Sequence, residues 1–258
     1  MSTLPLAERV AIITGASGGI GASCAEAFVA AGARVVMADV DDSGRQFAAR
    51  LGPDVCRFIH ADVSQEPDVQ RLVEETVRAF GRLDILVNNA AKLSPTLPVH
   101  ETALADFEAL VAVNLRGVFL CSKYAYPHLA RSRGNILNIS SMAGVHGEKD
   151  HAIYAATKGG INALTQSMAI DYGPQGIRCN ALCPSSVRTP NAERVIGALP
   201  NAAELRRLIA SLNALERVAE PEEVAAVAVF LVSEAASFIT GAIIPVSGGS
   251  ECGYGVKY

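Results

Sequence analysis

The chain has 258 residues, is half hydrophobic and 19% charged, and carries a formal net charge of −4. This mildly acidic balance argues against nucleic-acid binding, which needs a basic surface to meet the phosphates. No apolar run is long enough to span a bilayer and residues 1–9 include both acid and base, so we expect a cytoplasmic protein without membrane segment or signal peptide.

Six cysteines are scattered along the chain, most of them inside apolar runs where Cys acts as a small buried hydrophobe. Cys179 and Cys183 have the spacing of a metal pair. They lack the second Cys or His pair that a structural zinc site needs, so we predict no metal, and no disulfide.

Short β-rich runs recur along the chain, and helical segments separate them. The predicted strands are 10–14, 34–39, 55–60, 84–88, 135–140, 177–182 and 242–246. Several are apolar throughout, as is typical of strands that are covered on both faces. Their alternation with helices predicts an α/β fold with one Rossmann-like, doubly wound parallel sheet of about seven strands and helices on both faces.

Helix boundaries follow from the residues that flank each periodic run. Ser64 is the predicted N-cap of the third helix and Gly81 its left-handed stop. Pro174 ends another helix and Pro221 opens the last one, 222–231. No repeat or linker divides the chain, so we expect one domain over 1–258. Its two halves are a cofactor half (1–92) and a catalytic and substrate half (93–258).

A glycine-rich turn joins the first strand to the first helix. Glycines let the backbone approach a pyrophosphate, and the helix that follows presents free N–H groups. An ordinary turn is the alternative, but the position between strand and helix favours a dinucleotide site. The predicted cofactor contacts are Gly15, Ser17, Gly18, Gly19, Ile20 and Gly21.

An acid ends the second strand. Asp39 can accept hydrogen bonds from a ribose hydroxyl and would repel a 2′-phosphate, and Val40, not a base, follows it. The alternative is an ordinary turn with Asp41 and Asp42. We predict that both Asp39 and Val40 contact the cofactor, and that NAD is favoured over NADP.

The ends of the third and fourth strands supply further candidates, since ligands of open α/β sheets bind at the carboxyl ends of the strands. Asp62 and Val63 follow the third strand and could contact an adenine ring. The alternative interpretation is that they are ordinary turn residues before a helix. The end of the fourth strand contributes Asn89, Ala90 and Ala91.

Tyr154 and Lys158 are four residues apart in a helical segment, and so share a face. An ammonium beside a phenol favours the phenolate, so we predict that Lys158 lowers the pKa of Tyr154 toward the range of a general acid or base. Such pairs are common on surfaces. Here Ser140 and Ser141 close the fifth strand thirteen residues earlier, and Asn114 interrupts the apolar run 107–120.

In this order and spacing the motifs resemble those of the short-chain dehydrogenase/reductase family over nearly the whole chain. The matching motifs are Thr14-Gly15-x-x-x-Gly19-x-Gly21, Asn88-Asn89-Ala90, Asn114, Ser141, Tyr154-x-x-x-Lys158 and the segment 184–189. The resemblance implies four catalytic residues: Tyr154 as acid/base, Ser141 bonding the substrate oxygen, Lys158 holding the nicotinamide ribose, and Asn114 fixing a water that links Lys158 to solvent.

The resemblance also implies contacts of Tyr154 and Lys158 with the cofactor, and of Pro184, Ser185, Val187 and Thr189 around the nicotinamide. Ala91 and Ser185 depart from the family, which usually has glycine at both positions. A Cβ there changes the shape of the pocket, not the type of reaction.

Substrate selection is expected from the loops 93–100 and 144–151 and from a segment of about 188–215. The polar run 145–151 indicates a polar or cyclic substrate, with a solvated loop as the alternative. Arg194, Arg206 and Arg207 either meet an anion or line an exposed helix pair. The candidate substrate contacts are Ser141, His146, His151, Tyr154, Ser185 and Asn191.

These observations predict an NAD-dependent oxidoreductase that acts on a secondary alcohol or ketone of a small molecule. The alternatives are a 3-oxoacyl-carrier-protein reductase and a non-catalytic NAD-binding protein. The resemblance further implies a homotetramer or homodimer that associates through the helices carrying Asn114 and Tyr154.

Overall fold

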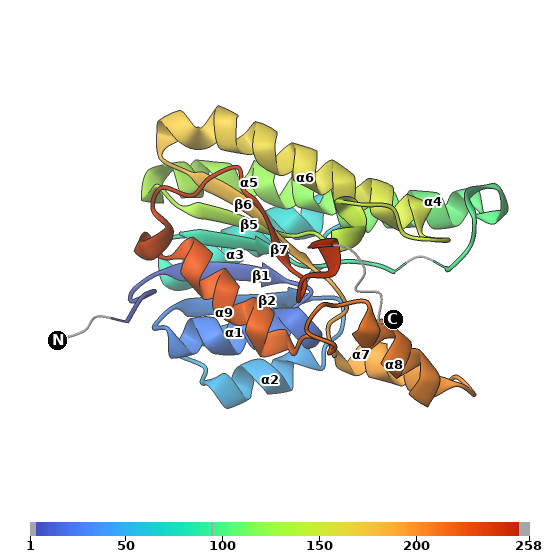
Figure 1. Cartoon of the computed structure of the whole chain (residues 1–258). Coiled ribbons are helices and arrows are strands. Elements are labelled where there is room, and N and C mark those ends of the chain that lie inside the picture. Colours follow the sequence, from blue (N-terminus) through green and yellow to red (C-terminus); the bar gives the residue numbers. More distant parts are fainter. Residues whose placement is uncertain (1–3, 94, 253–258) are drawn as a thin grey trace.

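Seven parallel strands form a single sheet in the order β3-β2-β1-β4-β5-β6-β7 in the computed structural model, which describes residues 4–93 and 95–252 (Figure 1). Ser94, in the first predicted substrate loop, lies outside the described residues. The strands are β1 (Val10–Thr14), β2 (Arg34–Asp39), β3 (Cys56–His60), β4 (Ile85–Asn88), β5 (Asn135–Ile139), β6 (Arg178–Pro184) and β7 (Ile243–Val246). The predicted fold class is confirmed, and no strand boundary differs from its prediction by more than two residues.

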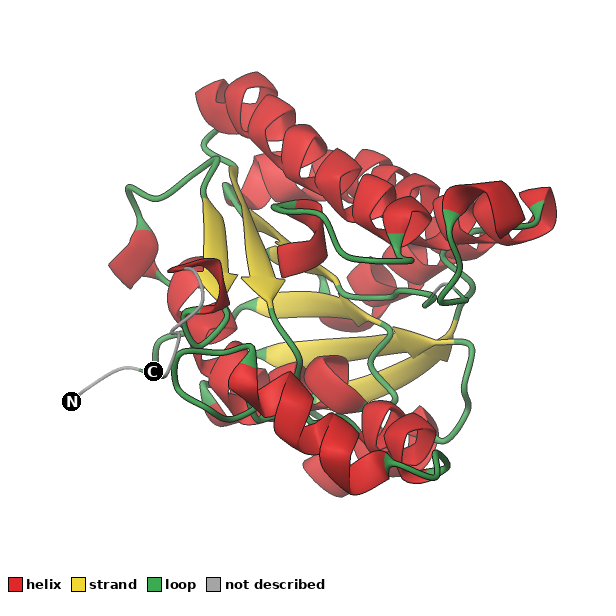
Figure 2. Ribbon diagram, turned by 45° about the vertical axis from the view of Figure 1, so that its right-hand side comes forward, coloured by secondary structure: helices red, strands yellow, loops and turns green. Residues whose placement is uncertain are grey.

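Helices cover both faces of this sheet (Figures 1 and 2). They are α1 (Gly19–Ala30), α2 (Gly44–Leu51), α3 (Glu66–Phe80), α4 (Leu104–Val111), α5 (Gly117–Ser132), α6 (Ala152–Tyr172), α7 (Pro190–Gly197), α8 (Ala202–Ser211) and α9 (Pro221–Val232). One core contains α1, α2 and α9, and the other contains α3, α5 and α6. None of the helices among the described residues combines the length and apolarity that crossing a membrane requires.

The first strand explains why the sequence pattern is apolar throughout and not alternating. Ala11 and Ile13 point into the core under α1, whereas Val10 and Ile12 point into the core under α3. Successive side chains of a strand face opposite sides, so a strand between two helical layers buries every residue. All five residues of β1 are buried.

The ends of α3 show which local signals determine the helix. Gly81 takes the left-handed conformation, φ 79°, and stops the helix as predicted. Ser64 is not the N-cap, and that prediction was wrong. The Asp62 carboxylate accepts the N–H of Ser64 at 2.8 Å in a local turn, so Gln65 occupies the N-cap position.

The order of the strands places the site. The chain leaves β1 toward β2 on one side, while β4 pairs with the other side of β1. At such a reversal the loops that follow the two neighbouring strands diverge and leave a crevice at the carboxyl ends. The glycine turn after β1 and the residues after β4 therefore face each other.

Candidate active site

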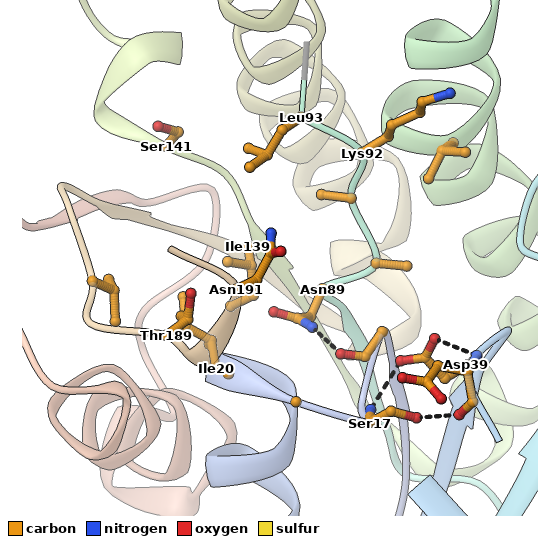
Figure 3. A pocket seen from close by; sticks show the side chains of 18 of the residues that line it. Ser17, Ile20, Asp39, Asn89, Lys92, Leu93, Ile139, Ser141, Thr189 and Asn191 are labelled. Atoms are coloured by element: carbon orange, nitrogen blue, oxygen red, sulfur yellow. Dashed lines mark hydrogen bonds between the residues drawn. The ribbon is translucent and has the colours of Figure 1, made fainter. Parts of the chain in front are cut away.

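A cavity of about 940 Å³ opens at the carboxyl ends of the strands, where the sequence predicted the site (Figure 3). Nearly all predicted cofactor contacts line it. They are Gly15, Ser17, Gly18, Gly19, Ile20, Asp39, Val40, Asp62, Val63, Asn89, Ala90, Ala91, Tyr154, Lys158, Pro184, Ser185, Val187 and Thr189. Gly21 is not a lining residue, and lies beneath the turn.

The glycines of the turn are required by close backbone approach. A Cβ on Gly15, whose φ is +63°, would lie 2.6 Å from Cα of Ala90. A Cβ on Gly21 would lie 2.3 Å from the carbonyl oxygen of Gly15. Helix α1 then begins with Gly18 at its N-cap and no side chain bonded there, so its first N–H groups remain open to an anion. The turn therefore fits a pyrophosphate.

Asn89 and Thr14 brace this turn against β4. The Asn89 amide donates to the carbonyl oxygens of Thr14 and Gly15, at 2.9 and 2.8 Å. The Thr14 hydroxyl accepts the N–H groups of Asn89 and Ala90, at 3.0 and 3.1 Å. These bonds join residues about 75 positions apart, so the shape of the turn depends on the whole sheet.

One end of the cavity carries acids. The carboxylate of Asp39 accepts the N–H of Ser17 at 2.9 Å and of Asp41 at 3.1 Å (Figure 3). Because each carboxylate oxygen has a second lone pair, both can also accept from ribose hydroxyls. Asp39, Val40 and Asp41 line this end, which therefore carries negative charge.

Ser141, Tyr154 and Lys158 come together at the other end. Tyr154 and Lys158 lie one turn apart on α6, with the Lys158 ammonium 5.6 Å from the centre of the phenol ring. The ammonium donates to the carbonyl oxygen of Ile139 at 2.8 Å. The Ser141 hydroxyl accepts the N–H of Ala143 at 3.1 Å, which orients it.

The pKa values of this group differ from the prediction that Lys158 lowers that of Tyr154. Burial raises the pKa of Tyr154 to about 12, while a hydrogen bond with Ser141 acts in the opposite direction. Burial also lowers the pKa of Lys158 to about 8. The ammonium is directed at Ile139 and is not among the causes of the Tyr154 shift, so burial sets the direction of that pKa and the phenol is neutral at pH 7.

Asn114 is buried in a π-helical turn, Ala112–Arg116, between α4 and α5. Its amide oxygen accepts the N–H of Lys92 at 2.7 Å, and its nitrogen donates to Lys92 O at 3.0 Å and to Thr157 Oγ1 at 3.3 Å. This pairing explains a polar amide in an apolar run, because it secures the chain just after β4. Asn114 does not line the cavity, and its water-holding role stays a prediction.

The candidate substrate residues divide into two groups. Ser185 and Asn191 line the cavity beside Ser141 and Tyr154, whereas His146 and His151 do not. His151 instead lies at the start of α6, where Nδ1 is 3.0 Å from the carbonyl oxygen of Lys149.

The sequence interpretation did not name several lining residues as contacts, among them Asp41, Lys92 and Ile139, whereas Leu93 and Arg194 lie in segments from which it expected substrate selection. For Lys92, the available signal was its position next to Asn89, Ala90 and Ala91, the predicted contacts that follow β4. The side chain of Leu93 points toward the space between Ser141 and Asn191 (Figure 3).

The cysteines behave as small core residues. All but Cys252 are buried, and none is in a disulfide. Within residues 4–93 and 95–252 no cluster of three His, Cys, Asp or Glu side chains could hold a metal ion.

Comparisons with known proteins agree with this geometry. The model of the family described as enoyl-(acyl carrier protein) reductase matches residues 15–251. L-fucose dehydrogenase of Oryctolagus cuniculus is 44% identical over 96% of this chain and 87% of its own. Meso-2,3-butanediol dehydrogenase of Serratia marcescens is 41% identical over 96% of both chains. The crystal structure of levodione reductase superposes with a TM-score of 0.91 at 32% identity, covering 96% of this chain and 100% of that one.

Proposed function

Because the chain belongs to the short-chain dehydrogenase/reductase family and is an oxidoreductase of secondary alcohols, we propose that it uses NAD to oxidise one hydroxyl of a small polyol or sugar. The cofactor preference is supported by the Asp39 carboxylate, which lines the end of the cavity that we assign to the adenosine ribose. The substrate class rests on relatives that act on L-fucose and meso-2,3-butanediol, both rich in hydroxyls.

The residues around the cavity divide the work. A bound nicotinamide supplies the hydride acceptor or donor. The Ser141 hydroxyl binds the oxygen of the reacting carbon, and the Tyr154 phenol oxygen exchanges a proton with it. Lys158, which lines the cavity, would hold the ribose hydroxyls of the cofactor. Leu93 lines the cavity and presents an apolar side chain to it.

The test begins with cofactor binding. NADH and NADPH are titrated into the purified protein at one salt concentration, following nicotinamide fluorescence. We expect NADH to bind at least tenfold more tightly. Initial rates with NAD are then measured over a panel that includes L-fucose, meso-2,3-butanediol and cyclic diols. Tighter NADPH binding, or no turnover of any polyol, would contradict the proposal.

A second candidate is reduction of a carbonyl on an acyl carrier protein. The description of the matching family model names a substrate on the same carrier, although an enoyl reductase reduces a C=C bond and not a carbonyl. One assay, turnover of a 3-oxoacyl thioester compared with turnover of free polyols, distinguishes the two functions. A carrier-protein reductase turns over a 3-oxoacyl thioester with NADPH and ignores free polyols.

The protein is further proposed to associate as a homodimer or homotetramer. Leu104 on α4 and Phe119 on α5 expose 69% and 50% of their surface, which supports burial against a second copy. Light scattering during gel filtration tests this. We also propose a single domain with a cofactor half and a catalytic half. A cytoplasmic location is proposed as well, and the buried free thiols are compatible with it.

A further inference from the structure

Asn162 shares the face of α6 that carries Tyr154 and Lys158, since the three residues are spaced by four. The chemistry above uses the first two and leaves Asn162 without a role. Its amide nitrogen donates to the carbonyl oxygen of Gly144 at 3.0 Å. Its amide oxygen lies 3.8 Å from the sulfur of Cys183.

Gly144 closes the short turn that holds Ser141. The turn is the 3-10 segment Met142–Gly144, with Ser141 as its N-cap. The N–H of Gly144 donates to Ser141 O at 3.0 Å. A Cβ on Gly144 would lie 2.6 Å from the carbonyl carbon of Lys158. The turn is thus pressed against the backbone of α6 at the catalytic lysine, with no side chain between them.

Cys183 adds a third element to this junction. It lies in β6 with no exposed surface, and burial raises the pKa of its thiol. The thiol is therefore protonated and can donate to the Asn162 oxygen. One amide then joins α6, the turn after β5 and the end of β6, which are the elements that carry Tyr154, Ser141 and the segment 184–189.

We propose that Asn162 is a positioning residue that holds the Ser141 hydroxyl beside the Tyr154 phenol through its bond to Gly144. It acts through Ser141 and touches neither substrate nor cofactor. The kinetic part of this inference rests on the proposed alcohol oxidation. It depends neither on the identity of the polyol nor on the preference for NAD.

The first test needs no substrate or cofactor. Hydrogen exchange is measured on Asn162→Leu and on the matched control Gln166→Leu, which removes an exposed amide from the same helix. Losing one hydrogen bond should speed exchange about tenfold at the amides of 143–146, with the rest of α6 unchanged, and the control should match wild type. Unchanged exchange at 143–146 would overturn the proposal. Should the leucine variant not fold, Asn162→Asp keeps the shape and removes the donor.

The second test is a double-mutant cycle with Ser141→Ala. Misplacement of the hydroxyl should lower kcat of Asn162→Leu about 30-fold, while the Kd for NADH stays within about twofold because the turn lies at the substrate end. In the Ser141→Ala background the same change should have almost no further effect. If the two substitutions instead lower kcat by the product of their separate effects, Asn162 does not act through Ser141, and the proposal is refuted. A wild type inactive on polyols would refute the proposed function instead, and hydrogen exchange alone would then decide the role of Asn162.

Discussion

Lys158 donates a hydrogen bond to the carbonyl oxygen of Ile139 at 2.8 Å, so its ammonium is attached to the end of β5 and not to Tyr154. The side chain is 2% exposed and its pKa is lowered to about 8 by burial. A lysine that is easier to deprotonate in the folded protein gives stability a definite dependence on pH.

This dependence can be measured against Lys158→Met. From the lowered pKa of about 8 up to the ordinary value near 10.5, the unfolded chain binds the additional proton, so stability rises with pH. The unfolding free energy of wild type relative to the variant should increase by about 2 kcal/mol between pH 7.5 and 9.5. Urea unfolding at fixed protein concentration measures it. Taking the difference cancels the opposite contribution of the buried thiols, and a flat or falling difference would contradict the expected sign.

Tyr154→Phe removes the phenol oxygen and keeps the ring that packs near Lys158. Turnover should fall about 10³-fold, because general acid–base catalysis is lost. NADH binding should stay within about threefold, since the turn and Asp39 are untouched. Stopped-flow rates and fluorescence titration measure the two quantities. A variant that keeps a tenth of wild-type turnover would exclude Tyr154 as the acid/base.

Asp39→Ala tests the preference for NAD. Loss of a charged acceptor should weaken NADH binding about tenfold or more, and adding Val40→Arg should make NADPH the tighter ligand. Asp42→Asn is the matched control, because Asp42 lies on the loop that follows Asp39, pairs with Arg45 in α2 and does not line the cavity. If the control shifts the preference as much as Asp39→Ala, then general charge and not a ribose contact sets it.

Gly21→Ala and Gly18→Ala separate packing from binding. A Cβ on Gly21 meets the Gly15 carbonyl at 2.3 Å, whereas a Cβ on Gly18 meets nothing within 4 Å. Gly21→Ala should lose about 3 kcal/mol of stability, while Gly18→Ala should unfold like wild type and bind NADH more weakly. Thermal unfolding and titration of both variants give the comparison. Equal melting temperatures would show that the turn can relax around Gly21.

The sequence predicted what local rules determine. The apolar runs predicted the strands, because a strand between two helical layers is buried on both faces, as every residue of β1 is. The glycine turn and Asp39 line the cavity as expected, and they were chosen because phosphate and ribose contacts need those residue types at the end of a strand. Their contact with a cofactor stays a prediction.

Other features depend on partners far along the chain and were not predictable. The partner of Asn114 is the backbone of Lys92, and that of Lys158 is Ile139. For this reason the predicted effect of Lys158 on the pKa of Tyr154 was wrong for this structure. The polarity of 145–151 likewise could not tell that His146 lies away from the cavity.

The cavity draws its walls from residues as far apart as Gly15 and Arg194. During synthesis, a chain still on the ribosome gains nothing from a dinucleotide until all of these segments have emerged and the strands that follow β4 have joined the sheet. A ligand stabilises only the form that binds it. A dinucleotide bound in this cavity would therefore stabilise only the fully assembled sheet, and the chain has to reach that state by its own packing.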